Sequence, residues 1–137
     1  MQLTFDTSIR LLSKLVVIAT LLLIFAGALI KSHEVGLSVP DWPTSYGKQM
    51  FSFPLSEMVG GIFYEHGHRV FATIVGFLTL VLAVLIGFSN QPQWVKKTSL
   101  LALILVVSQG LLGGMTVLYF LPPPISILHG ILAQTFF

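Results

Sequence analysis

Three apolar runs, each close to the length of a membrane-crossing helix, constrain this sequence of 137 residues more than any other feature. They cover residues 15–30, 70–88 and 99–121, and the first extends back to Leu11 if the Lys14 side chain reaches toward the lipid headgroups. A helix of about 20 apolar residues crosses the hydrocarbon layer. Only 9% of the residues are charged, which is too few to give a folded domain a polar surface in water. The sequence therefore predicts an all-α integral membrane protein whose solvent is the lipid bilayer.

A fourth apolar run follows three prolines at 122–124, begins at Ile125 and stops at Phe137. At 1.5 Å per residue its helix would be about 20 Å long, too short to cross the bilayer. Because the run stops without a charged flank, we expect the chain to be the front part of a longer protein. The predicted fold is a four-helix transmembrane bundle with a truncated fourth helix and an outer loop at 31–64, its helices lying at about 11–30, 66–88, 99–121 and 125–137.

Positive charges predict the orientation of these helices. Arg10, Lys14, Lys96 and Lys97 lie on one side of the predicted membrane, so by the positive-inside rule the amino terminus and the short 89–98 loop face the cytoplasm or matrix. The long outer loop then faces outward.

A cleavable secretory signal is the alternative for the first run, since positive residues precede it and small residues occur at 26–28. The apolar run continues through Leu29 and Ile30, which favours a retained helix.

The composition excludes several kinds of chemistry. The sequence has no cysteine, so it forms no disulfide, thiolate nucleophile, Cys-ligated zinc site, iron–sulfur cluster or covalent c-type heme. The net charge of +2 comes from 7 basic and 5 acidic residues scattered along the chain, so we expect no nucleic-acid partner. Chemistry must come from histidines, acidic groups or a cofactor.

Ionisable residues at membrane depth are costly unless they are paired or ligated, and a cluster of them opens the second run. Glu65 and His68 are three residues apart and share a helix face, whereas His66 points about 160° away from His68. The small residues Ala72 and Gly76 continue the Glu65 face and leave room for a helix or a flat cofactor. His68 is therefore the histidine that we expect in the bundle interior, and we expect His66, like His33, to be a wetted interface residue.

His129 in the fourth run completes a predicted pair. The second and fourth helices run in the same direction, so His68 and His129 lie at similar depth on the same side of the membrane. Two imidazoles from facing helices suit a six-coordinate heme iron. Zinc or copper is the competing metal, but it needs a third ligand that only Glu65 could supply. The alternative without any metal is that each histidine only hydrogen-bonds a neighbouring helix.

Other polar residues leave alternatives open. Arg69 is an interface anchor, an ion-pair partner for Glu65, or a clamp for a carboxylate such as a heme propionate, with the last two favoured equally. In the third run, Gly110 and Gly114 form a GxxxG pair that indicates close helix packing, while Gln109 or Thr116 could hydrogen-bond within a pocket. The two tryptophans, at 42 and 94, are expected in the aromatic belts.

Four motifs, taken together, resemble the heme A synthase family of terminal-oxidase assembly from about residue 15 onward. They are Gly-Leu-Ser-Val-Pro-Asp-Trp-Pro-Thr-Ser-Tyr-Gly at 36–47, Glu-His-Gly-His-Arg at 65–69, Gln-Gly-Leu-Leu-Gly-Gly-Met-Thr-Val-Leu at 109–118 and His-Gly-Ile-Leu-Ala-Gln at 129–134. The resemblance implies an eight-helix enzyme of the bacterial inner membrane, built from two four-helix halves that each hold a histidine pair. This chain is similar to the N-terminal half.

The resemblance also implies a reaction and its site. The family oxidises the C8 methyl group of heme O to the formyl group of heme A through successive hydroxylations, and the electrons leave to an acceptor. His68 and His129 would be the axial ligands of the substrate heme O, Arg69 would help to bind it, and Glu65 would be the acid or base near the reacting edge. A heme b cofactor would occupy the other half. Heme O synthase or a second copy of the chain is an expected partner.

Departures from the family limit this carry-over. The pair of loop cysteines found in another branch is missing, and residues 31–34 replace a Thr-Gly-Ser-Gly-like run. The second histidine pair lies outside this chain, so completing the enzyme would require the other half or a homodimer. Two further functions are a b-type cytochrome that only transfers electrons and a non-catalytic assembly subunit. Glu65 beside His68 favours the enzyme, because an electron carrier has no use for an acid there.

Overall fold

The computed structural model describes residues 2–137, with side chains from residue 6 onward. Four helices form it, and no strand occurs in this range: α1 (Gln2–Ser32), α2 (Gly61–Gly87), α3 (Gln93–Leu118) and α4 (Pro123–Phe136). Two short 3-10 helices, η1 (Met50–Ser52) and η2 (Leu55–Glu57), lie in the segment between α1 and α2. The predicted all-α fold is confirmed.

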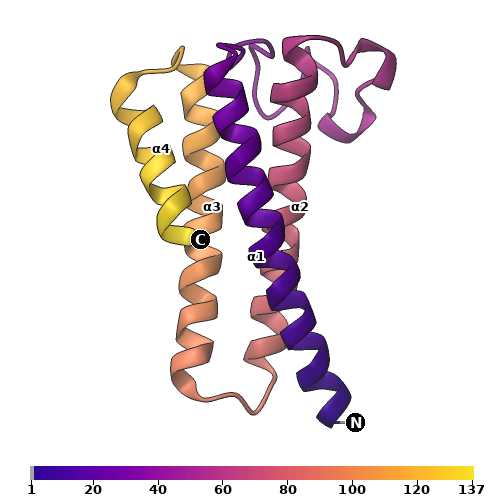
Figure 1. Ribbon diagram of the computed structural model, residues 1–137, viewed down its shortest axis with the longest axis vertical. Coiled ribbons are helices and arrows are strands. Elements are labelled where there is room, and N and C mark those ends of the chain that lie inside the picture. The colour runs from indigo at the N-terminus through magenta and orange to yellow at the C-terminus, as the bar shows by residue number, and fades with distance from the viewer. Residues whose placement is uncertain (1) are drawn as a thin grey trace.

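The helices pack in chain order, α1 on α2, α2 on α3 and α3 on α4. The three long helices extend along the whole molecule, whereas α4 covers only the half of α3 nearest the α3–α4 turn (Figure 1). Because α2 and α4 both begin at that end, their first turns lie at the same level. The segment between α1 and α2 folds over the same end and extends beyond α2 (Figure 1). We call its residues 33–60 the outer segment.

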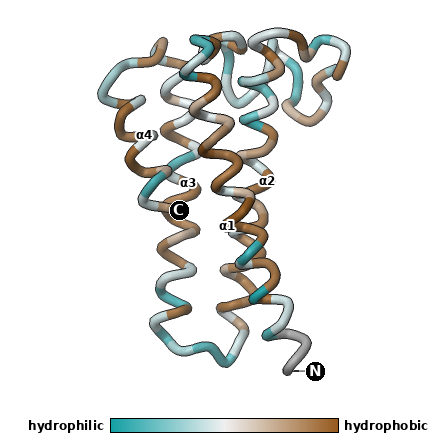
Figure 2. Tube along the Cα trace, viewed as in Figure 1, coloured by the Kyte–Doolittle hydropathy of each residue, from teal (hydrophilic) through white to brown (hydrophobic). Residues whose placement is uncertain are grey.

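The surface around the long helices is apolar, as a lipid environment requires. Three helical stretches are long and apolar enough to cross a membrane, namely Asp6–Ser32, Gly61–Gly87 and Gln93–Leu118. Polar residues concentrate toward the two ends of the bundle (Figure 2). Within the helices, buried hydroxyls bond their own backbone: Thr20 Oγ1 donates to Val16 O and Thr79 Oγ1 to Val75 O. The chain is therefore an integral membrane protein, as predicted.

The helices begin earlier in the chain than the apolar runs do. Helix α2 already includes residues 61–69, and α3 begins at Gln93, six residues before the run that starts at Ser99. A membrane helix continues into the interface, so hydropathy marks the lipid-embedded part and not the helix ends. The early start of α3 has a structural use, because Lys96 Nζ donates to Gly87 O and satisfies a carbonyl at the end of α2.

Proline positions the turn between α3 and α4. Helix α3 ends at Leu118 instead of Leu121, and Phe120 and Leu121 both adopt left-handed backbone, with φ of 57° and 56°. The residue before a proline is disfavoured in a right-handed helix, which excludes a continuous helix through Leu121. Helix α4 then begins at Pro123, earlier than Ile125, because proline fits the first turn of a helix.

Candidate functional site

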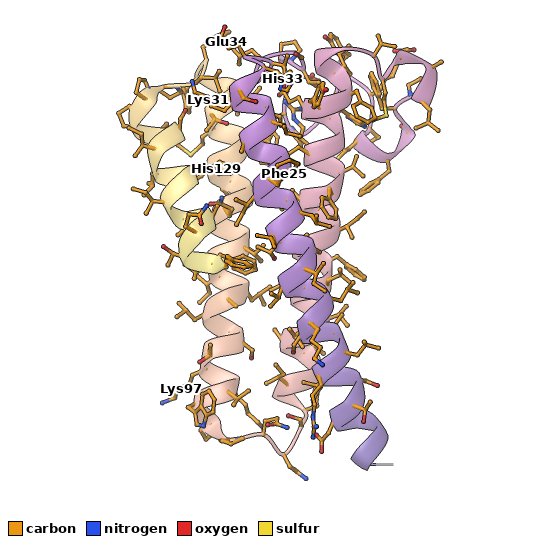
Figure 3. The ribbon with its side chains drawn as sticks, viewed as in Figure 1. Phe25, Lys31, His33, Glu34, Lys97 and His129 are labelled. Atoms are coloured by element: carbon orange, nitrogen blue, oxygen red, sulfur yellow. The ribbon has the colours of Figure 1, made fainter. Side chains whose placement is uncertain are left out.

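Two half-buried imidazoles face neighbouring helices, His68 on α2 and His129 on α4. Each ring lies against a glycine of a neighbouring helix. A Cβ atom on Gly27 of α1 would lie 3.2 Å from His68 Cε1, and a Cβ atom on Gly113 of α3 would lie 3.1 Å from His129 Cε1. Any larger residue would push the rings away, so the two glycines make the room that the rings occupy. Figure 3 labels His129 on α4, beside α3.

In each ring the Nδ1 atom is buried and has no hydrogen-bond partner among the described residues. The alternative without any metal, in which each histidine hydrogen-bonds a neighbouring helix, is therefore not what these two side chains do in the described part of the chain. Buried polar atoms are nearly always paired in folded proteins, so two unpaired imidazole atoms need an explanation.

Two further buried polar atoms without a partner belong to the same region. Gln109 donates through Nε2 to His129 O at 2.8 Å, but its Oε1 is unpaired, as is Ser126 Oγ. Ser126 lies three residues before His129, on the same face of α4. The sequence left Gln109 as a possible pocket residue and gave no role to Ser126; helix spacing alone could have placed it beside His129. Three of the unpaired atoms, on Gln109, Ser126 and His129, thus belong to the region where α3 packs on α4, and the fourth is on His68 of α2.

A three-ligand metal site does not form among the described residues. No group of three or more His, Cys, Asp or Glu side chains in this range could hold a metal ion. The zinc or copper alternative, which needs Glu65 as third ligand, therefore has no structural support.

Glu65 faces the outer segment, and no hydrogen bond joins it to His68. Its Oε1 atom pairs with Arg69 Nη2 at 2.5 Å, and its Oε2 atom accepts a hydrogen bond from Val39 N at 2.9 Å. Both side chains are buried, with relative exposures of 5% for Glu65 and 8% for Arg69. Glu65 and His68 are three residues apart on one helix face, but the Glu65 carboxylate bonds Arg69 and Val39 and not His68.

Arg69 fastens the outer segment to α2. Its Nη1 atom donates to Asp41 O at 2.6 Å and to Thr44 O at 3.2 Å, and its Nη2 atom donates to Val39 O at 2.6 Å as well as to Glu65. Of the two roles that the sequence favours equally, the ion pair is formed. A propionate would have to compete for this guanidinium with three backbone carbonyls.

Asp41 organises the outer segment itself. Its carboxylate accepts hydrogen bonds from Thr44 Oγ1 and from the backbone N–H groups of Tyr46 and Gly47, at 2.5, 2.7 and 2.9 Å. Burial by itself raises the pKa of Asp41, but these hydrogen bonds together outweigh it and hold the pKa below its ordinary value. The motif at 36–47 is thus a tightly bonded turn that covers the outer end of α2.

His66 corrects a prediction: it is buried, with 2% of its surface exposed, and is not a wetted interface residue. Its Nδ1 atom lies 2.8 Å from the hydroxyl of Ser45, and its ring packs on Phe53 at 4.7 Å between centroids. The prediction was wrong because the outer segment folds down onto this side of α2. His33, in contrast, is exposed and stacks on Tyr64.

Trp42 and the GxxxG pair give a second correction. A Cβ atom on Gly114 would lie 2.5 Å from the indole of Trp42, so this tryptophan packs into the bundle against α3 and does not belong to an aromatic belt. A Cβ atom on Gly110 would meet nothing within 4 Å, so the pair does not serve helix–helix contact among the described residues. Thr116, also considered for a pocket, bonds its own helix at Gly113 O. Trp94 is exposed at the start of α3.

Comparison with known proteins identifies relatives. The sequence profile of the family described as "Cytochrome oxidase assembly protein" matches residues 10–136. A heme A synthase of Shewanella oneidensis is 30% identical over 131 residues, which cover 86% of this chain and 39% of the relative. A heme A synthase of Alkalihalophilus pseudofirmus is 28% identical over 123 residues, which cover 88% of this chain and 40% of the relative.

A heme A synthase of Halalkalibacterium halodurans is 25% identical over 124 residues, which cover 89% of this chain and 40% of the relative. No solved structure matches the chain. The chain thus spans about two fifths of the length of these curated relatives.

Proposed function

The chain belongs to the cytochrome oxidase assembly protein family, and from that membership we propose that it is a heme A synthase-like membrane oxidoreductase whose substrate is heme O. In this proposal the C8 methyl group of heme O is oxidised to a formyl group by successive hydroxylations, and the electrons pass to an acceptor. The membrane would be the bacterial inner membrane, with the amino terminus in the cytoplasm.

One observation carries the proposal at the level of residues: the half-buried imidazoles of His68 and His129 each lie against a glycine, and the buried Nδ1 atom of each has no hydrogen-bond partner among the described residues. A ring nitrogen that bonds iron no longer lacks a partner, so this donor pair fits a heme held from both sides. Heme O bound there would present its macrocycle edge to the surrounding side chains. The family's heme b is assigned to the other half, and no residue of this chain is assigned to it.

Glu65 and Arg69 would act together at the outer end of this site. In this proposal the Glu65 carboxylate takes up protons released when C–H bonds are oxidised. Its ion pair with Arg69 supports a positioning role for the arginine, which holds both the acid and the outer segment. Gln109 Oε1 and Ser126 Oγ, both unpaired, are the further groups able to hydrogen-bond a polar substituent of the substrate.

The engagement of Glu65 favours one alternative, a b-type cytochrome that only transfers electrons. Both Glu65 oxygens are bonded to Arg69 and Val39, and neither is bonded to His68. If the Glu65 carboxylate only holds the outer segment in place, the proposed heme site consists of His68 and His129 without an acid, which suits electron transfer alone. The identity of the bound heme separates the two functions.

The test is to express the chain in a host that makes heme O, purify it in mild detergent, record reduced-minus-oxidised spectra and extract the porphyrin. We expect low-spin heme O or an oxidised derivative, lost or strongly reduced in His68→Ala and in His129→Ala and retained in the matched control His33→Ala, an exposed histidine. Heme b alone would favour the cytochrome. Wild-type protein without heme, or an unchanged spectrum in His68→Ala, would overturn the proposed ligands.

A further inference from the structure

A cavity of about 260 Å³ lies between the outer segment and a face of α2 that the proposed heme site does not use. Methionine, phenylalanine and aliphatic side chains line it, and His66 is its one ionisable residue. Val70 and Ile74 on its wall belong to the membrane-spanning part of α2, and Leu55 on the opposite wall is exposed. The cavity therefore adjoins the lipid at the outer end of the bundle, where an apolar molecule can enter it from the membrane.

His66 is held in a fixed orientation at this cavity. Its Nδ1 atom bonds the hydroxyl of Ser45, which is itself fully buried, and Phe53 packs on the ring. When the Ser45 hydroxyl donates to Nδ1, the ring carries its proton on Nε2. No described residue hydrogen-bonds Nε2. In that tautomer the cavity is an apolar space with one oriented N–H donor on its wall.

We propose that this cavity binds a membrane-soluble quinone, with a ring carbonyl accepting the hydrogen bond from His66 and the isoprenoid chain lying along the apolar side of α2. A lipid acyl chain would fit the apolar walls but would leave the buried N–H donor without a partner, which is costly. A quinone has both an apolar chain for the walls and a carbonyl oxygen that accepts the hydrogen bond from His66.

The redox role of the quinone rests on the proposed function. Conversion of a methyl group and one water molecule into a formyl group releases four electrons and four protons, and two quinone molecules take these up in succession to give two quinols. His66 and His68 are two residues apart and point to nearly opposite sides of α2. The acceptor would therefore be separated from the proposed heme ligand by about one helix diameter, ~10 Å.

Binding is testable without any activity. The full chain is purified in mild detergent and photolabelled with an azido-benzoquinone that carries a decyl chain, and labelled peptides are mapped by mass spectrometry. We expect label in residues 50–58 and 66–74. His66→Phe should weaken binding about fivefold, the effect of one lost hydrogen bond, while His33→Phe, a histidine that lies outside the cavity, should bind as the wild type does.

Competition and a second variant distinguish the sources of an apolar ligand. Unlabelled decylubiquinone should displace the label, and decanol should not. Ile74→Trp fills the cavity from its lipid-facing wall and should abolish labelling with His66 intact, even if His66→Phe does not fold. Equal displacement by decanol with full labelling of His66→Phe would mean an acyl-chain cavity and would overturn the proposal, as would label outside these two peptides. Loss of heme with labelling retained would refute the proposed function alone.

Discussion

At the scale of single residues, Glu65 and Arg69 form an asymmetric pair. Arg69 has four acceptors, three of which are backbone carbonyls of the outer segment, whereas Glu65 has only Arg69 and one backbone N–H. Removing one partner of a buried ion pair is costly because the other is left uncompensated. When the ion-pair partner is removed, Arg69 keeps three backbone carbonyl acceptors, whereas Glu65 keeps one backbone N–H donor.

The expected result is therefore unequal destabilisation. Arg69→Gln leaves a buried carboxylate with one N–H donor and should cost about 3–5 kcal/mol of unfolding free energy. Glu65→Gln leaves Arg69 with its three carbonyls and should cost clearly less. Denaturant unfolding in detergent, together with amide exchange at Val39, measures both effects. Equal losses, or a larger loss for Glu65→Gln, would contradict the assignment of Arg69 as the main fastening of the outer segment.

At the scale of helices, the glycines of α3 have different contacts, although all three lie in the one short motif at 109–118. Gly113 accommodates the ring of His129 and Gly114 accommodates the indole of Trp42, while a Cβ atom on Gly110 would meet nothing within 4 Å. A glycine in a helix interior is needed where a neighbour approaches closely, and only two of these positions meet that condition.

This difference predicts the outcome of a matched pair of substitutions. Gly113→Leu should displace the His129 ring and reduce heme retention at least several-fold. Gly110→Leu, on the same helix and of the same chemistry, should retain heme at the wild-type level. Heme content per protein after gentle purification is the measurement. Similar heme content in the two variants would show that the contact between Gly113 and His129 does not shape the site.

At the scale of the whole molecule, the charged residues at the two ends of the bundle allow the proposed orientation to be tested. Lys31 and Glu34 lie at the end of the bundle that the outer segment covers, and Lys97 lies near the opposite end of the bundle (Figure 3). The chain has no cysteine, so each introduced cysteine is the only one present. The exposed residues Lys31 and Lys97 are suitable sites.

We expect a membrane-impermeant maleimide to label Lys31→Cys and not Lys97→Cys when it is added to intact bacterial spheroplasts. Inverted membrane vesicles are the control and should give the opposite pattern. The reverse result in spheroplasts would mean that the amino terminus faces outward and that the positive-inside argument fails for this protein.

Much of the architecture followed from the sequence because it depends on hydropathy and chain order alone. Three runs of apolar residues determine three membrane spans, and alternating direction makes α2 and α4 begin at the same end. From this the sequence predicts His68 and His129 at similar depth. The absence of cysteine and the Pro-rich turn are also local properties. The family followed from four short motifs, and the sequence profile agrees with it.

The contacts around the outer segment were decided only by the tertiary structure. Val39 and Glu65 are separated by 26 positions, and Asp41 and Arg69 by 28, and no periodicity in the sequence pairs them. Helix geometry gave the direction in which Glu65 and His66 point, but not what lies there. When the outer segment folds onto α2, Val39 N bonds Glu65, His66 becomes buried and Trp42 packs against Gly114 of α3. The reason is physical: the roles of these side chains depend on which distant backbone comes to cover them.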